Sequence, residues 1–231
     1  MDIEIFAQKI KNFYEDYWAR RLCSPSNVTA IRFKTILRLL PKSFSKVLDV
    51  GCGDGTTLSL IKRHYGNFQD FGFDISERAV KLAKDKGVNA FVQNADDPFP
   101  FPDSFFDVII CSEVLEHLVF PGKCVKEIYR VLRSGGVAIF SIPNLGFIKN
   151  RIRLLFGISP CDQGRFCRSE HLHYWTCSSF KYFLKIYNFK VLMVKGIKDR
   201  SWKNILTYNF PCIFSDYIFF KTCKMTPHAR E

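Results

Sequence analysis

The sequence lacks several features that would assign the protein to a common class. It has no apolar run long enough to span a bilayer, no CxxC pair among its nine cysteines, and no internal repeat or low-complexity segment. Residues 1–21 are charged and aromatic, so we do not expect a signal peptide. These absences predict a cytoplasmic protein whose cysteines are reduced thiols.

Acidic residues are the minority among the charged ones. Lys and Arg number 34, against 22 Asp and Glu, which gives a formal net charge of +12. This charge favours anionic partners such as nucleic acid, lipid head groups or phosphorylated substrates, and it also promotes solubility. The basic residues form no block of the kind that marks a nucleic-acid-binding tail. Apolar residues make up 47% of the 231 positions, which excludes a disordered chain and suffices for the core of one α/β domain.

The middle of the chain alternates between strand-like and helix-like segments. The expected strands are 46–50, 70–73, 88–93, 106–111 and 137–141, and the expected helices are 56–65, 76–86 and 123–132, the last closed by 134–136. This order predicts an α/β fold with a doubly wound, Rossmann-like, mostly parallel sheet.

We expect a single domain in four parts. These parts are an N-terminal helical segment with a break at 24–26 (1–40), a core of alternating strands and helices that contains a glycine-rich segment (41–143), an insert rich in Arg, Gly, Cys, His and aromatic residues (144–175), and a C-terminal helix with the last strands (176–231).

The strongest local signal is the segment VLDVGCGDGTTLSLI. An expected strand ends, Gly51, Gly53 and Gly55 follow, and an expected helix begins. Glycines permit a tight turn and a close approach of the backbone to a ligand, and a helix N-terminus offers free N–H groups. Asp74 ends the next strand about 20 residues on, where dinucleotide-binding folds place the acid that binds ribose hydroxyls. Together these residues predict a site for an adenosyl group.

At this point the chain resembles the class I S-adenosylmethionine-dependent methyltransferases. The matching pieces appear in the family's order over residues 46–144: VLDVGCGDG, GFDIS, FPFPDSFFDVIICSEVLEHL and EIYRVLRSGGVAIFSIPN. The resemblance implies a seven-stranded sheet with an antiparallel last strand, and FPCIFSDYIFFKTCK is similar to the family's closing strands. It also implies S-adenosyl-L-methionine as the cofactor.

The resemblance assigns cofactor contacts to residues after each of the first four strands. Asp74 would hold the ribose and Ile75 the adenine, and Asp96, or its neighbour Asn94, would bind the adenine amino group. The remaining contacts would lie at the methionine end and at the border with the acceptor: Asp49, Gly51, Cys52, Gly53, Ser112 and Glu113.

The segment SEVLEHL follows the fourth strand and has three interpretations. If it is helical, Glu113 and His117 share a face, with Glu116 adjacent. The cluster could order the chain locally, His117 could take a proton from the acceptor, or the three residues could hold a divalent metal. Quinone-biosynthesis O-methyltransferases carry a similar E-x-x-E-H cluster that is proposed to bind magnesium in some of them. We favour the structural role, and magnesium is the least favoured.

The insert PNLGFIKNRIRLLFGISPCDQGRFCRSEHLHYWT is expected to select the acceptor. His171 and His173, two residues apart, are further candidates for a general base. A zinc site formed by Cys161, Cys167, His171, His173 and Cys177 is disfavoured, because the spacing fits no familiar ligand pattern. Lys149, Arg151 and Arg153 predict a solvated helix face, or less favourably a contact with an anionic membrane surface.

We therefore expect methyl transfer to an acceptor that the sequence does not identify, with a small-molecule, lipid or glycan hydroxyl favoured. The end of the fourth strand reads CSEV, where amine-directed nucleic-acid methyltransferases would carry N-P-P-Y. Two alternatives remain open at this point: a non-catalytic protein that keeps the fold, and an RNA methyltransferase favoured by the net charge.

Overall fold

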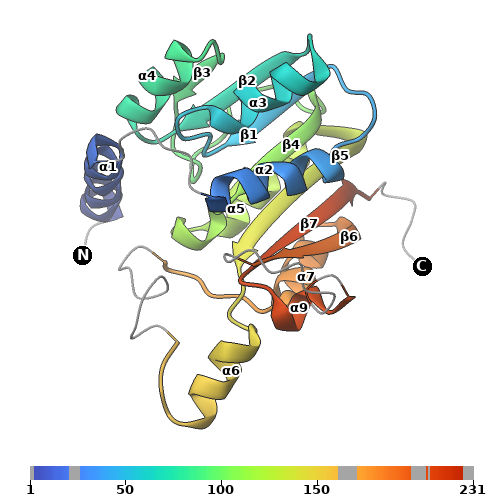
Figure 1. Ribbon diagram of the computed structural model, residues 1–231. Helices are drawn as coiled ribbons and strands as arrows, with labels where there is room; N and C mark the ends of the chain where they lie inside the picture. The colour runs from blue at the N-terminus through green and yellow to red at the C-terminus, as the bar shows by residue number, and fades with distance from the viewer. Residues whose placement is uncertain (1–2, 21–26, 161–170, 199–206, 208, 226–231) are drawn as a thin grey trace.

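The computed structural model describes residues 3–20, 27–160, 171–198, 207 and 209–225. Its centre is a seven-stranded sheet in the order β3-β2-β1-β4-β5-β7-β6 (Figure 1). Strands β1 to β5 are mutually parallel, and β7 is antiparallel to both of its neighbours. The predicted doubly wound sheet is thus confirmed. The strands are β1 (Lys46–Val50), β2 (Gln69–Asp74), β3 (Ala90–Val92), β4 (Phe106–Ser112), β5 (Leu132–Pro143), β6 (Phe189–Ile197) and β7 (Tyr217–Lys224).

Helices cover both faces of this sheet, because the central strands are apolar on both sides. Within β4, Val108 and Ile110 belong to one core, while Ile109 and Cys111 belong to the other. The first core is covered by α2 (Asn27–Leu39), α3 (Thr56–Tyr65) and α4 (Glu77–Asp85), and the second by α5 (Pro121–Val131) and α7 (Cys177–Ile186).

The remaining helices surround the carboxyl ends of the strands. Helix α1 (Ile3–Arg20) is attached to the start of α4, where Lys11 forms an ion pair of 2.8 Å with Glu77. Helix α6 (Ile148–Leu155) projects from the body of the molecule after β5 (Figure 1). There are also two short helices: η1 (Leu115–His117) follows β4, and α9 (Pro211–Phe214) comes directly before β7. No helix in the described part of the chain is long and apolar enough to cross a membrane.

Local sequence signals fixed several element ends as predicted. The Ser76 hydroxyl accepts a hydrogen bond of 3.2 Å from the amide of Ala79 and caps α4. Gly66 ends α3 with a positive φ of 76° and donates its N–H to the Lys62 carbonyl.

Two local predictions were wrong, and the helical arrangement considered for residues 113–117 does not occur. Helix α5 begins at Pro121, a residue whose fixed φ suits the first helical turn. Residues 134–136 do not separate helix from strand, since β5 already begins at Leu132 and its pairing with β4 shifts register over this stretch. Glu113 has a φ of 58°, so Glu113 and His117 do not share a helix face. The expected break at 24–26 lies outside the described residues.

The prediction of reduced thiols was also wrong for one pair. Cys177 at the start of α7 and Cys212 in α9 form a disulfide, with their Cα atoms 5.4 Å apart. These cysteines are 35 residues apart, and the packing of the two helices brings them together. Their spacing in the sequence therefore could not predict that they would pair. Cys177 is therefore not a zinc ligand, and Cys161 and Cys167 lie outside the described residues.

Candidate active site

A cavity of about 570 Å³ opens at the carboxyl ends of the strands. It lies where β1 and β4 meet and the strand order reverses, which is where doubly wound sheets bind ligands. All ten residues predicted to contact the cofactor line it: Asp49, Gly51, Cys52, Gly53, Asp74, Ile75, Asn94, Asp96, Ser112 and Glu113.

The loop after β1 leaves bare backbone at the cavity wall. Gly51 and Gly53 have φ values of 67° and 54°, in the left-handed region that favours glycine. A Cβ atom on Gly51 would lie 2.5 Å from a methyl carbon of Val114, and one on Gly53 would lie 2.7 Å from the ring of Trp18. Both positions therefore require glycine for space as well as for conformation.

The amides of this loop mostly hold the loop itself. The Cys52 amide donates to the Phe73 carbonyl at 2.9 Å, and the Gly53 amide donates to the Asp74 carboxylate at 2.9 Å. The Gly55 amide donates to the Cys52 carbonyl at 3.0 Å. The loop is thus bound to the end of β2, and it offers a ligand mainly close access to the backbone.

Asp74 is buried at the end of β2 and is held in one orientation. Its two carboxylate oxygens accept from the amides of Gly53, at 2.9 Å, and Ser76, at 3.0 Å. Burial raises the pKa of Asp74, and these two hydrogen bonds oppose that rise by favouring the ionised form. Since each oxygen of an ionised carboxylate has a second lone pair, Asp74 can still accept from two adjacent hydroxyls of a ligand.

Asp49 at the end of β1 carries a strongly perturbed carboxyl group. Burial raises its pKa to about 8, with further contributions from the nearby charges of Asp74 and Asp54. A cationic ligand group beside Asp49 would favour its ionised form and counteract this effect.

Asp96 and Asn94 both line the cavity, but they are used differently. The Asn94 side chain accepts from the Asp96 amide at 3.0 Å, which forms a tight local turn. The Asp96 carboxylate accepts from the amides of Val119, at 3.1 Å, and Phe120, at 3.0 Å. Asp96 therefore joins the loop after β3 to the loop after η1, in addition to facing the cavity.

Glu113 belongs to a polar network that the sequence did not predict. Its carboxylate forms an ion pair of 3.0 Å with Arg32 from α2 and accepts from the Ser141 hydroxyl at 2.9 Å. The Arg32 guanidinium also lies 4.3 Å from the ring centre of Tyr217. Burial raises the pKa of Glu113, and the Arg32 charge opposes this rise. Arg32 and Tyr217 line the cavity as well, although no local motif marks either of them.

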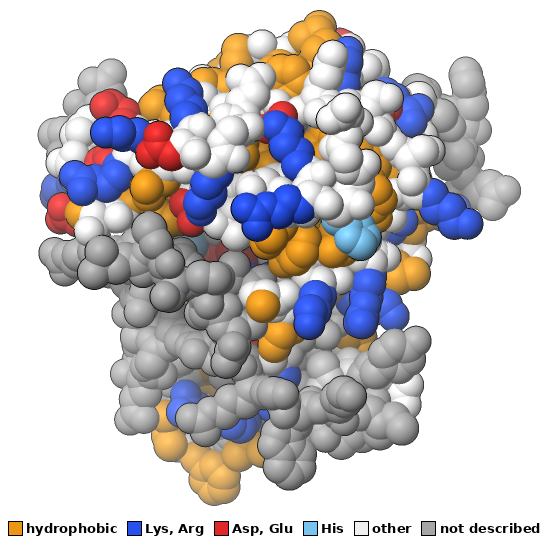
Figure 2. Space-filling model, turned by 45° about the horizontal axis from the view of Figure 1, so that its top comes forward, with side chains coloured by type: hydrophobic (Ala, Val, Ile, Leu, Met, Phe, Trp, Pro, Cys, Tyr) orange, Lys and Arg blue, Asp and Glu red, His pale blue; other side chains and the backbone are white. Residues whose placement is uncertain are grey.

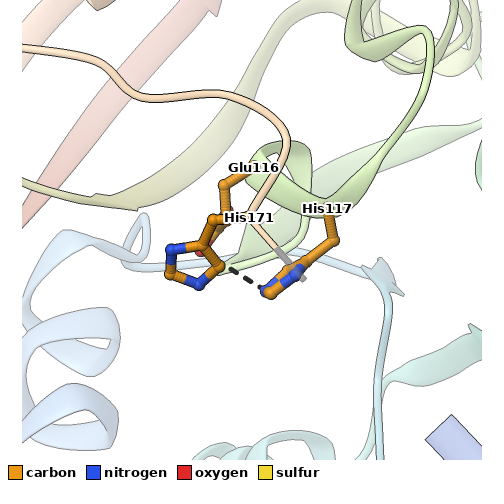
Figure 3. A group of neighbouring side chains, drawn as sticks. All are labelled: Glu116, His117 and His171. Carbon is orange, nitrogen blue, oxygen red and sulfur yellow. Dashed lines mark ion pairs between the residues drawn. The ribbon is translucent and has the colours of Figure 1, made fainter. Parts of the chain in front are cut away.

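Glu116, His117 and His171 meet at another part of the cavity wall (Figure 3). The Glu116 side chain is 1% exposed, and its carboxylate has no hydrogen-bond partner among the described residues. His117 Nε2 lies 3.8 Å from Glu116 Oε1, and the two imidazole rings are 4.7 Å apart. Burial raises the pKa of Glu116 well above its ordinary value, and the charge of Glu113 raises it further.

The Glu116 backbone holds the end of the insert against η1. Its carbonyl accepts from the amides of Leu172, at 2.7 Å, and His173, at 3.1 Å. These bonds bring His171 to the cavity, whereas the His173 ring stacks on Trp175 and is not among the cavity-lining side chains. Of the three predicted histidines, the structure therefore brings His117 and His171 together and places His173 elsewhere.

The same cluster has a donor set that suits some metal ions. Glu116, His117 and His171 each offer one ligand atom, and these atoms lie within 4.8 Å of one another. One carboxylate and two imidazoles fit ions such as Zn²⁺, Mn²⁺ or Fe²⁺, whereas Mg²⁺ prefers oxygen ligands. Glu113, a member of the predicted metal set, is engaged by Arg32 instead.

A switch-point cavity with a glycine loop after β1 and a carboxylate after β2 is the arrangement of the class I methyltransferases, which use S-adenosylmethionine. The chain belongs to this class, since residues 17–194 match the family described as a methyltransferase domain. The protein is therefore an S-adenosylmethionine-dependent methyltransferase, and the non-catalytic alternative is set aside.

Individual relatives agree with this assignment. The chain is 26% identical over 211 residues to a ubiquinone biosynthesis O-methyltransferase of Coxiella burnetii, covering 85% of this chain and 86% of that one. It is 28% identical to a 27-O-demethylrifamycin SV methyltransferase of Amycolatopsis mediterranei, over 54% of this chain and 49% of that one. A solved S-adenosylmethionine-dependent methyltransferase of Archaeoglobus fulgidus shares the fold, with a TM-score of 0.64, 18% identity, and coverage of 92% and 98%.

Proposed function

We propose that the protein transfers a methyl group to a hydroxyl oxygen of a small-molecule, lipid or glycan acceptor, and that His117, with His171 beside it, receives the hydroxyl proton. The observation that carries this proposal is the meeting of two imidazoles and a buried carboxylate on the wall of the cofactor cavity. The names of two relatives, ubiquinone biosynthesis O-methyltransferase and 27-O-demethylrifamycin SV methyltransferase, support an oxygen atom as the methyl acceptor.

The cofactor supplies an electrophilic methyl group when it is bound. The chain's own residues would hold and orient it: Asp74 would accept from the ribose hydroxyls, and Asp49 would lie beside the cationic methionine end. The bare backbone at Gly51 and Gly53 permits close contact along the adenosyl group. Fixing donor and acceptor in line would then supply much of the rate acceleration.

A hydroxyl acceptor must lose its proton as the new bond forms, and neutral imidazole is suited to take it near neutral pH. His117 would receive the proton, with the His171 ring against it at 4.7 Å. The resulting imidazolium would lie beside Glu116, whose carboxyl group would be favoured in its ionised form by that positive charge.

Turnover of the cofactor with a panel of hydroxylated acids, quinone precursors, lipids and glycans tests this proposal. With an accepted substrate, we expect His117→Asn and His171→Asn to lower kcat by about 100-fold or more. His173→Asn is the matched control and should retain activity, because His173 stacks on Trp175 outside the cavity. Full activity of both cavity variants would contradict the assignment of the base.

A metal ion is a second candidate for this cluster, favoured by the donor set of Glu116, His117 and His171. If a cation is required, excess chelator abolishes turnover and Zn²⁺ or Mn²⁺ restores it better than Mg²⁺ does. Undiminished turnover in chelator excludes the metal and leaves the proton-transfer role.

A further inference from the structure

Helix α6 turns its apolar side away from the protein. Asn150 is the buried residue of this helix, and its side-chain amide donates to the Asn144 carbonyl at 3.1 Å. At 100° per residue, Ile148, Ile152 and Leu155 lie on the side opposite Asn150. Leu155 is 83% exposed and Ile152 is 47% exposed. Phe156, directly after the helix, is 76% exposed.

This orientation is fixed by polar contacts at the base of the helix. The Asn144 side chain donates to the carbonyls of Cys212 and Ser215, at 3.1 and 2.9 Å, and accepts from the Gly146 amide at 2.9 Å. Arg151 Nε donates to the Gly146 carbonyl at 2.7 Å. These bonds hold the Asn150 side of the first part of α6 against the body, so the strip opposite Asn150 faces outwards. Near the end of the helix Leu154, which lies on the Asn150 side, is also exposed, at 54%.

Basic residues flank the exposed apolar strip on both sides. Around the helix axis, Lys149 and Arg153 lie between the strip and Asn150 on one side, and Arg151 lies between them on the other side. Residues 144–160 contain no Asp or Glu. Figure 2 shows hydrophobic side chains at the lower tip of the molecule, with basic side chains next to them.

We propose that α6 is a docking surface for an anionic lipid bilayer, with the apolar strip inserted between head groups and the flanking basic residues on lipid phosphates. The helix has eight residues, so it spans about 12 Å and would lie along the surface. The charge argues for this occupant over a second copy of the chain, because a symmetric dimer through α6 would bring two sets of three basic side chains together.

Vesicle sedimentation tests the proposal. The full chain is mixed with vesicles of phosphatidylcholine alone, or of phosphatidylcholine and phosphatidylglycerol in equal amounts. We expect binding to the anionic vesicles that weakens with added salt, and much weaker binding to the neutral ones. Leu155→Ser with Phe156→Ser should reduce binding to the anionic vesicles at least tenfold, and Lys149→Glu should reduce it about fivefold or more.

The matched control is Tyr182→Ser with Ile186→Ser on α7. These two side chains are 69% and 56% exposed and lie one helical turn apart, with Lys181 and Lys185 beside them. The pair therefore resembles the strip in exposure and in basic neighbours but lies on another helix. This variant should bind as the unchanged protein does. Absence of binding to anionic vesicles, equal loss in the control, or a concentration-dependent dimer abolished by the Leu155 and Phe156 changes would each overturn the proposal.

Discussion

Helix α4 on the cofactor side and helix α6 on the acceptor side of this sheet place their apolar sides in opposite directions. On the cofactor side (residues 46–97), α4 buries Ala79, Val80 and Ala83 against the sheet. On the acceptor side (residues 144–187), α6 buries only Asn150 and exposes its apolar strip. Periodicity thus shows that a helix has an apolar side, but it does not show whether the protein or another surface covers that side.

The two sides also differ in how their polar contacts are made. The cofactor side relies on contacts between consecutive elements, such as the bond from the Gly53 amide to Asp74 over 21 positions. The cavity wall after β4 relies on distant partners, such as Arg32 and Glu113 over 81 positions. The first kind of contact is tied to a motif, whereas the second appears only after folding.

The largest effect should come from Asp74→Ala, which tests the cofactor side. In the role proposed for Asp74, this change would remove two charge-assisted hydrogen bonds to the ribose, each of about 1.5–3 kcal/mol, so cofactor affinity should fall by about 100-fold or more. Calorimetric titration measures the affinity, and circular dichroism checks that the fold persists. Unchanged affinity in a folded variant would remove Asp74 from the site.

The next effect should come from Arg32→Met, which leaves the Glu113 carboxylate buried without its cation. We expect the free energy of unfolding to fall by about 3 kcal/mol, measured by urea denaturation. The double variant Arg32→Met with Glu113→Gln should recover most of this loss, because no unpaired charge remains. Equal instability of the single and double variants would show that packing, and not the charge, is responsible.

Asp49 should make cofactor affinity depend on pH. Below its pKa of about 8 the carboxyl group is neutral, so binding a cationic group beside it must first release a proton. Affinity should therefore increase between pH 6.5 and 8, by up to about tenfold per unit, and then become constant. Asp49→Asn should abolish this dependence in titrations across the same range.

The same raised pKa has a consequence for stability. Because the folded state keeps Asp49 protonated above the ordinary pKa of 3.8, its contribution to the free energy of unfolding decreases as pH rises from 3.8 to about 8 and is constant above. In urea denaturation measured across this pH range, the free energy of unfolding of Asp49→Asn should lack this decrease.

The smallest effects should come from the two side-chain caps. Ser76→Ala removes a buried cap on the cofactor side, and Thr176→Ala removes a partly exposed one at the start of α7. We expect losses of about 1–2 kcal/mol and about 1 kcal/mol in the free energy of unfolding. If Thr176→Ala lowered the free energy of unfolding more than Ser76→Ala does, the expectation that the buried cap contributes more would be wrong.

The cofactor side could be predicted from sequence because its signals are local. Gly51, Gly53 and Asp74 lie at strand ends that parallel pairing must bring together, so their meeting follows from the strand order. The pairing of His117 with His171 could not be predicted, because it depends on the insert end binding the Glu116 carbonyl. The register of Glu113 was missed for a similar reason, since its positive φ breaks the helical pattern assumed for its segment.

The position of β7 has a consequence for the order of assembly. This strand follows all the others in the chain, yet it lies between β5 and β6. During synthesis β5 therefore keeps an unpaired edge, and β6 has no neighbour in the sheet, until residues 217–224 have left the ribosome. A chain that stops shortly before Tyr217 would still contain β1 to β5, but the edge of β5 that normally pairs with β7 would stay unpaired. That edge could pair with a strand of another chain, so late truncation should promote aggregation.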